Sequence, residues 1–271
     1  MGKLDGKVAF ISGGARGQGR SHAVLLAQQG ADIITFDICE QIESVPYPMS
    51  TPADLEQTIK EVEATGQRIF TCKADVRDVA AVRQVFELGT AEIGPVDIVL
   101  ANAGIGVGGL DATDRDWSDV IDVNLTGVWN TVRVAVPSMI EQGHGGSIVI
   151  TSSTGGLIGV ATNEPGLLAY QASKHGVIGL MRSWANYLAP HSIRVNSVAP
   201  TAVSTPMAVN DLMAKALEED PGLANAWTNA LPVGMVDAID ISNAISWLVS
   251  DEGRYVTGTV VPVDAGMVNK R

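Results

Sequence analysis

Short apolar runs rich in valine and isoleucine alternate with amphipathic stretches along the whole chain of 271 residues. Most runs are continuously apolar, which is typical of strands buried on both faces of a parallel sheet. We expect strands over Val8–Ile11, Asp32–Phe36, Arg68–Cys72, Ile98–Leu100, Ser147–Ile150, Arg194–Val198 and Val260–Val263. This alternation predicts an α/β fold: a Rossmann-type, doubly wound parallel sheet of about seven strands with helices on both faces.

The amphipathic stretches between these runs have the periodicity of helices. We expect helices over Ser21–Gln29, Leu55–Ala64, Val79–Ile93, Asp114–Glu141, Tyr170–Leu188 and Ile239–Val249. Two segments interrupt the alternation: Cys39–Pro52, with three prolines, predicts an inserted loop, and Thr205–Gly234 predicts a substrate lid. The chain contains no linker or internal repeat, so we expect a single domain over residues 1–271.

Composition and charge narrow the class of protein. Hydrophobic residues make up 46% of the chain and charged residues 18%, as in globular proteins with a buried core. The net charge of −12 opposes binding to nucleic acid. Cys39 and Cys72 form no paired motif, and the four histidines are not spaced as metal ligands. With no signal-peptide pattern or membrane-spanning run, we expect a cytoplasmic protein without metal or membrane partners.

A glycine-rich turn follows the first expected strand. It has the sequence Ser12-Gly13-Gly14-Ala15-Arg16-Gly17-Gln18-Gly19 and leads into a helix. Glycine permits a tight turn and close approach of the backbone to a pyrophosphate, which the helix N-terminus then faces. An ordinary turn is the alternative, but the position between strand and helix favours a dinucleotide site.

Asp37 ends the second strand at about the distance from the glycines that this motif requires. A carboxylate here accepts hydrogen bonds from both hydroxyls of an adenosine ribose and repels a 2′-phosphate. This favours NAD over NADP. Arg16 is a complication, since a guanidinium beside the turn can pair with a 2′-phosphate; its alternative is a solvated loop charge.

Polar and small residues also follow the third and fourth strands. Asp75-Val76 and Asn102-Ala103-Gly104 stand at carboxyl ends, where open α/β sheets bind ligands. Asp75 is placed to meet the adenine amino group. It is also placed to cap the helix that begins at Val79, and the two interpretations are compatible.

Four polar residues suggest proton chemistry. Tyr170 and Lys174 lie one helical turn apart, Ser152-Ser153 follows a strand, and Asn124 lies within a long helix. Each has a plain alternative: a chance match to the spacing of Lys174 for Tyr170, a strand cap for Ser153, a helix-bending residue for Asn124 and a solvated charge for Lys174. All four alternatives together are implausible.

These motifs, in this order, resemble the classical short-chain dehydrogenase/reductase family. The matching stretches are Ser12–Gly19, Asn102–Gly104, Asn124–Gly127, Ser152–Gly156, Tyr170–Lys174 and Arg194–Pro200. The resemblance implies the catalytic tetrad Asn124, Ser153, Tyr170 and Lys174. It also implies nicotinamide contacts near Pro200, Val203, Thr205 and Met207. The expected cofactor contacts are therefore Gly13, Arg16, Gly17, Gln18, Gly19, Asp37, Asp75, Val76, Asn102, Ala103, Gly104, Tyr170, Lys174, Pro200, Val203, Thr205 and Met207.

The tetrad implies a mechanism for alcohol oxidation. A tyrosine with a pKa of about 10 is a poor base at neutral pH, so we expect the ammonium of Lys174 and the nicotinamide to lower the pKa of Tyr170. Tyr170 then takes the alcohol proton as hydride leaves for the nicotinamide. Ser153 is expected to bind the substrate oxygen, and Asn124 to hold a water that relays protons to Lys174.

The turn Gly13–His22 and the insertion Cys39–Pro52 resemble one subgroup, the carveol-dehydrogenase-like, mycofactocin-associated members. This implies tightly held NAD, an apolar, terpenoid-like secondary alcohol, an external mycofactocin-like redox carrier and a homotetramer. The insertion is expected to cover the adenosine end, and the apolar residues of the lid (Met207, Leu212, Met213, Leu217 and Trp227) suit such a substrate or pack the lid itself. Two rivals remain: an NADP-dependent biosynthetic ketoreductase and a non-enzymatic dinucleotide-sensing protein.

Overall fold

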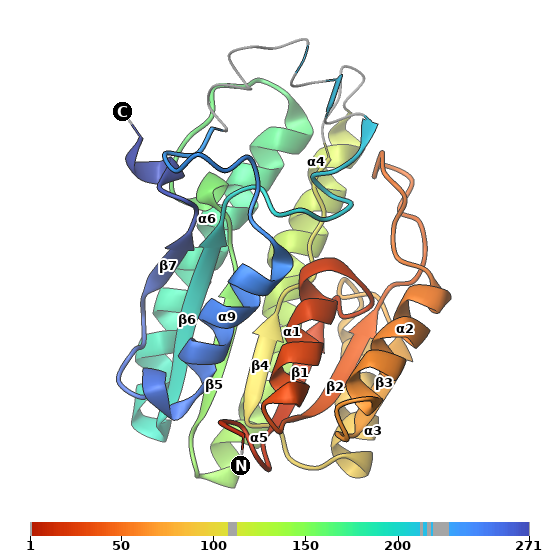
Figure 1. Cartoon of the computed structure of the whole chain (residues 1–271), viewed down its shortest axis with the longest axis vertical. Helices are drawn as coiled ribbons and strands as arrows, with labels where there is room; N and C mark the ends of the chain where they lie inside the picture. The colour runs from red at the N-terminus through yellow and green to blue at the C-terminus, as the bar shows by residue number, and fades with distance from the viewer. Residues whose placement is uncertain (1, 108–112, 212–213, 216–217, 219–227, 271) are drawn as a thin grey trace.

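A seven-stranded, all-parallel sheet forms the centre of the protein, with the order β3-β2-β1-β4-β5-β6-β7 (Figure 1). The computed structural model describes residues 2–107, 113–211, 214–215, 218 and 228–270. The strands are β1 Val8–Ser12, β2 Asp32–Asp37, β3 Ile69–Lys73, β4 Ile98–Ala101, β5 Gly146–Thr151, β6 Ile193–Pro200 and β7 Val260–Val263. The expected fold class is confirmed, and each expected strand lies within about a residue or two of its place.

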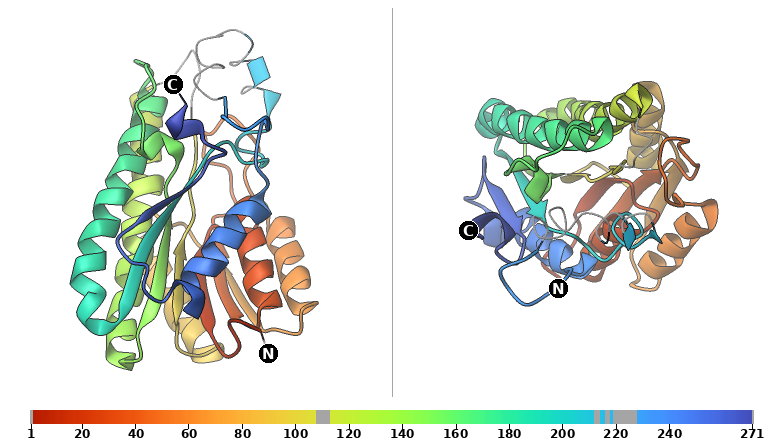
Figure 2. Two further views of the ribbon diagram at one scale, coloured as in Figure 1. Left: turned by 60° about the vertical axis from the view of Figure 1, so that its left-hand side comes forward. Right: turned by 90° about the horizontal axis from the view of Figure 1, so that it is seen from above.

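Helices cover both faces of the sheet (Figure 2). Helices α1 (Gly17–Gln28), α2 (Pro52–Glu63) and α9 (Ala238–Val249) cover one face. Helices α3 (Val79–Glu92), α5 (Gly127–Gln142) and α6 (Pro165–Leu188) cover the other, with α4 (Asp114–Ile121) packed against α6. None of the helices in the described part of the chain has the length and apolarity needed to cross a membrane.

The core lies on both sides of the sheet, which explains the uninterrupted apolar runs. In β1, Phe10 packs toward α3 and α5, whereas its neighbour Ile11 packs toward α1 and α9. Both side chains are fully buried. Because the strand has no solvent-facing side, no polar alternation is needed.

The expected helix Asp114–Glu141 is not continuous. It divides into α4, a π-helical turn over Asp122–Thr126 that contains Asn124, and α5. A π turn is a single turn with i→i+5 hydrogen bonds inside an otherwise helical stretch, and the expected helix extends over it without a break, so the division was not predicted. Helices α1 and α6 also begin earlier than expected, at Gly17 and Pro165.

The order of the strands determines where a ligand crevice forms. The chain begins in the middle of the sheet, and its crossovers run outward from β1 toward β3 and from β4 toward β7. The carboxyl ends of all strands lie along one edge, toward the top of Figure 1. Open α/β sheets bind ligands where the crossovers diverge, here between β1 and β4.

Candidate active site

A cavity opens at the carboxyl edge, between β1 and β4. Its walls come from the glycine-rich turn, the ends of β2 to β4, the insertion after β2 and the segment after β6. The lining residues are Gly13, Arg16, Gly17, Gln18, Gly19, Asp37, Ile38, Ile42, Tyr47, Met49, Ser50, Ala74, Asp75, Val76, Asn102, Ala103, Gly104, Ile105, Val123, Thr205, Pro206 and Met207. The cavity thus gathers most of the expected cofactor contacts; Pro200, Val203, Tyr170 and Lys174 lie outside its lining.

The glycine-rich turn has the features that a dinucleotide requires. Gly13 adopts φ +75°, and a Cβ there would come 2.8 Å from the Cα of Ala103, so only glycine fits. Helix α1 begins without a side-chain cap and without acidic residues in its first turn, whereas α2 is capped by Thr51. The buried Oε1 of Gln18, on the cavity wall, has no partner among the described residues. Uncapped N–H groups at a helix N-terminus suit phosphate oxygens, so the residues present fit a dinucleotide.

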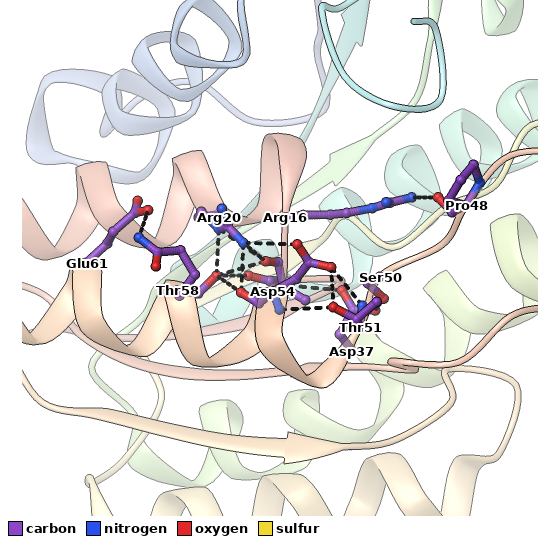
Figure 3. Close-up of polar contacts among 12 residues, drawn as sticks. Arg16, Arg20, Asp37, Pro48, Ser50, Thr51, Asp54, Thr58 and Glu61 are labelled. Carbon is purple, nitrogen blue, oxygen red and sulfur yellow. Dashed lines mark hydrogen bonds and ion pairs between the residues drawn. The ribbon is translucent and has the colours of Figure 1, made fainter. Parts of the chain in front are cut away.

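Side chains behind the turn hold its shape (Figure 3). Arg20 donates from Nε (3.1 Å) and Nη2 (2.6 Å) to the carbonyl of Ala15. Thr58 donates to the carbonyl of Gly14 at 3.0 Å, and it is fully buried. The N–H groups of Gly13 and Gly14 donate to the carbonyl of Phe36 at 2.8 and 3.2 Å, so the start of the turn is fixed to β2 and the uncapped N-terminus of α1 is what remains for a phosphate.

Asp37 is fixed by two hydrogen bonds at the wall of the cavity. Its Oδ2 accepts from the N–H of Ala15 at 3.0 Å, and its Oδ1 accepts from the hydroxyl of Ser50 at 2.5 Å (Figure 3). The residue is 9% exposed. A carboxylate fixed in this way presents its remaining lone pairs to a ribose and opposes a phosphate dianion.

Arg16 binds the insertion. Its Nη2 donates to the carbonyl of Pro48 at 2.5 Å, and the side chain also lines the cavity. This hydrogen bond is exposed to solvent, so the guanidinium contacts the inserted loop while it remains a partly solvated charge.

Asp75 lines the cavity and forms an ion pair with Arg77 at 2.7 Å. The helix-cap interpretation of Asp75 is wrong: Asp78 caps α3 by accepting from the N–H of Ala80 at 2.8 Å. Asp78 directly precedes the first helical residue, which is the position a cap requires.

Gly104 connects the cavity to the predicted catalytic residues. A Cβ on Gly104 would lie 3.3 Å from Asn124 Oδ1 and 3.5 Å from Lys174 Nζ. Upstream, Asn102 Nδ2 donates to the carbonyl of Ser12 at 3.2 Å and so joins the ends of β1 and β4. The dinucleotide cavity and the tetrad thus share one wall.

The tetrad residues gather from three elements. Tyr170 and Lys174 lie on α6, and the Nζ of Lys174 is 5.6 Å from the centre of the Tyr170 ring. Ser153, just after β5, lies near Tyr170: a Cβ built on Gly155 would be 3.6 Å from Ser153 Oγ and 3.5 Å from Cε1 of Tyr170. The adjacent Ser152 donates to the carbonyl of Lys174 at 2.9 Å. Lys174 itself is 4% exposed and donates to the carbonyl of Thr151 at 2.9 Å.

The side chain of Asn124 binds the loop after β4. Its Oδ1 accepts from the N–H of Ile105 and its Nδ2 donates to the carbonyl of the same residue, both at 2.8 Å. The side chain is fully buried. The expected relay water at Asn124 stays a prediction, and it concerns groups of this residue other than the amide that binds Ile105.

Burial dominates the electrostatics of the tetrad. It raises the pKa of Tyr170, and the hydrogen bond with Ser153 offsets this only in part. It also lowers the pKa of Lys174 to about 8. Among the protein's own groups, burial therefore raises this pKa, and the expected lowering by Lys174 together with a bound nicotinamide stays a prediction.

Several lining residues were missed by sequence reasoning: Ile38, Ile42, Tyr47, Met49, Ser50, Ala74, Ile105, Val123 and Pro206. Four of them belong to the insertion, whose residues match no binding motif. Of the expected nicotinamide contacts, Thr205 and Met207 line the cavity, Pro200 ends β6, and Val203 pairs with Val236. The lid residues Leu212, Met213, Leu217 and Trp227 lie outside the described residues.

The buried ammonium predicts a distinct pH dependence of stability. Below pH 8, Lys174 is charged in the folded and unfolded chains, and its desolvation penalty is fully present. Between pH 8 and 10.5 the unfolded chain binds more protons, so stability rises with pH. Relative to Lys174→Met, the wild type should gain a few kcal/mol of unfolding free energy across this window, measured by urea titration of nucleotide-free protein. A pH-independent difference would contradict the buried charge.

Comparison with known proteins places this arrangement in a family. Residues 13–268 match the family model described as enoyl-(acyl carrier protein) reductase. An uncharacterized oxidoreductase of Mycobacterium tuberculosis is 56% identical over 99% of this chain and 98% of its own length. The (-)-trans-carveol dehydrogenase of Rhodococcus erythropolis is 46% identical over 100% of both chains. The crystal structure of carveol dehydrogenase from Mycobacterium avium in complex with NAD is 50% identical, covers 100% of both chains and superposes with a TM-score of 0.94. The chain belongs to the short-chain dehydrogenase/reductase family of oxidoreductases.

Proposed function

We propose that the protein is an NAD-dependent alcohol dehydrogenase that interconverts a secondary alcohol and its ketone. One observation carries the proposal: Gly104 adjoins the dinucleotide cavity on one side and Asn124 and Lys174 on the other. A hydride acceptor in the cavity therefore comes next to Lys174, whose Nζ is 5.6 Å from the centre of the Tyr170 ring. The tetrad is complete, which disfavours a non-enzymatic dinucleotide sensor.

The protein's groups handle the proton while NAD, when bound, supplies the hydride acceptor. The phenol of Tyr170 accepts the proton of the alcohol during oxidation and returns it during reduction. The hydroxyl of Ser153, beside Tyr170, binds the substrate oxygen. Lys174, directed by the carbonyl of Thr151, provides the positive charge that favours the phenolate.

NAD is proposed over NADP because of Asp37. The carboxylate has one hydrogen bond to each oxygen and cannot turn away from the ribose site without breaking one of them. Relatives support this choice, since the carveol dehydrogenase of Mycobacterium avium was crystallised in complex with NAD. Arg16, the residue that favoured the NADP-dependent ketoreductase, is bound to Pro48.

The proposed substrate is an apolar, terpenoid-like secondary alcohol. The carveol dehydrogenases among the relatives support this class. Two apolar side chains near Gly106 also support this class of substrate. Met207 would lie 3.6 Å from a Cβ built on Gly106, and the next residue, Val107, is buried. We further propose that residues 1–271 act as one domain in which residues 39–52 cover the cofactor and residues 205–234 form the lid.

The cellular setting follows from the same subgroup and belongs to the proposal. Tightly held NAD would need an external, mycofactocin-like redox carrier, and the location would be cytoplasmic. A homotetramer would bury the outer faces of the long helices, where Trp117 on α4 and Trp129 on α5 are 42% and 43% exposed. Large exposed aromatic side chains of this kind suit subunit contacts.

The Tyr170→Phe variant tests the proton-transfer role. It should lower kcat for secondary alcohols by about 10²–10⁴-fold, because no other group replaces the phenol in general base catalysis. NADH binding, measured by fluorescence, should change little. Tyr255→Phe, at a residue that is 88% exposed, is the matched control and should retain full activity. Wild-type rates in Tyr170→Phe would refute the mechanism.

Cofactor choice is tested at Asp37. The Asp37→Ser variant removes the fixed charge beside the ribose site, so the preference for NAD over NADP should fall by about 10-fold or more. Dissociation constants for NADH and NADPH, titrated by fluorescence, give this ratio. Asp75→Asn, another cavity-lining acid, should change both constants alike. An unchanged ratio in Asp37→Ser would mean that another feature selects the cofactor.

A further inference from the structure

The insertion over residues 39–52, here called the strap, forms one wall of the cavity. Ile42, Val45 and Tyr47 are 5%, 3% and 6% exposed, so the strap has its own buried side chains. Gln41 organises it internally: its Nε2 donates to the carbonyl of Val45 at 2.8 Å, and its Oε1 accepts from the N–H of Met49 at 3.0 Å. The strap is thus an ordered segment with a defined conformation.

The strap is attached at both ends of the cavity. At the adenosine end, Ser50 donates to Asp37 and the carbonyl of Pro48 accepts from Arg16 (Figure 3). At the other end, the N–H of Gly106 donates to the hydroxyl of Tyr47 at 3.2 Å. A third attachment leads to α4, where Ser44 donates to Asp119 at 2.7 Å.

The hydrogen bond between Gly106 and Tyr47 lies next to Ile105, the residue that the side chain of Asn124 binds. Ile105 is bound through its N–H and carbonyl to the side chain of Asn124, and the next N–H along the chain, that of Gly106, is bound to Tyr47. Ile105 is 2% exposed, and both residues of the loop therefore have fixed positions. Burial also raises the pKa of Tyr47 to about 12, so its hydroxyl remains neutral in the working range.

We propose that Tyr47 is a positioning residue that couples the strap to the catalytic loop at Ile105 and Gly106. The strap lines the cavity, so its displacement opens a route for a dinucleotide, and displacement of Tyr47 breaks the bond to Gly106. Loss of that bond loosens Ile105 and, through it, Asn124 beside Lys174. Opening of the strap at its Tyr47 end thereby disturbs the tetrad, whereas opening at its Ser50 end leaves the loop at Ile105 and Gly106 in place. The catalytic consequence rests on the proposed function, whereas the structural coupling does not.

Two variants of the strap distinguish this coupling from a general loosening of the strap. Tyr47→Phe removes the acceptor for Gly106, and Ser50→Ala removes the donor to Asp37 at the far end. Hydrogen exchange of the Ile105 amide, resolved by NMR, reports the loop directly, with Val99 in β4 as the internal standard for global unfolding. NADH dissociation, followed by stopped-flow fluorescence, reports the strap.

The expected results differ between the variants. In Tyr47→Phe the Ile105 amide should exchange roughly 3- to 10-fold faster, the factor that loss of one hydrogen bond allows. In Ser50→Ala it should exchange at the wild-type rate. NADH should dissociate faster from both. Tyr47→Phe should also lower kcat about 3- to 10-fold while the KM for the alcohol changes less than about twofold.

Equal exchange of Ile105 in the two variants, whether both unchanged or both accelerated, would overturn the coupling. An unchanged kcat in Tyr47→Phe, with faster exchange of Ile105, would overturn its catalytic consequence. If the wild type oxidises no alcohol, the proposed function fails, and the exchange measurement still decides the structural coupling.

Discussion

The divergence of the crossovers between β1 and β4 is the constraint on which the site depends. A parallel sheet places every carboxyl end on one edge, and the outward connections leave a crevice at the centre of that edge. The glycine-rich turn follows β1 and Gly104 follows β4, the two strands that border the crevice, and Asp37 ends β2, the neighbour of β1. The order of the strands therefore brings together residues that are far apart in the sequence.

Burial sets the chemistry of the site as strongly as charge does. Lys174 is held inside the fold by one carbonyl, and burial lowers its pKa to about 8 while raising that of Tyr170. Desolvation alone thus makes the tyrosine a weaker acid. The positive charge that favours the phenolate has to come from groups brought next to it, which makes the positions of Lys174 and of the bound cofactor decisive.

The sequence predicts the sheet and which residues come together at the site. It does not predict the hydrogen bonds that hold those residues in place. Strands such as Val8–Ile11 were predicted because their apolar composition follows directly from burial on both faces. The π turn at Asn124 was not predicted, because it is a single turn between two helical stretches and no residue type marks it. The bonds of Ser50 to Asp37 and of Tyr47 to Gly106 depend on how a proline-rich loop without periodicity folds back over the sheet. Arg20 and Thr58 were missed for a similar reason, since they bind backbone carbonyls and leave no side-chain motif.

A single-turnover measurement tests the central claim, that this site moves a hydride between a secondary alcohol and NAD. The protein is loaded with NAD⁺ and mixed with a panel of apolar secondary alcohols, and the near-ultraviolet absorbance of reduced nicotinamide is followed. Reduced nicotinamide should form with at least one such alcohol, in proportion to the nucleotide bound, together with the matching ketone. Absence of both products with every alcohol, from a folded protein shown to bind NAD⁺, would contradict it.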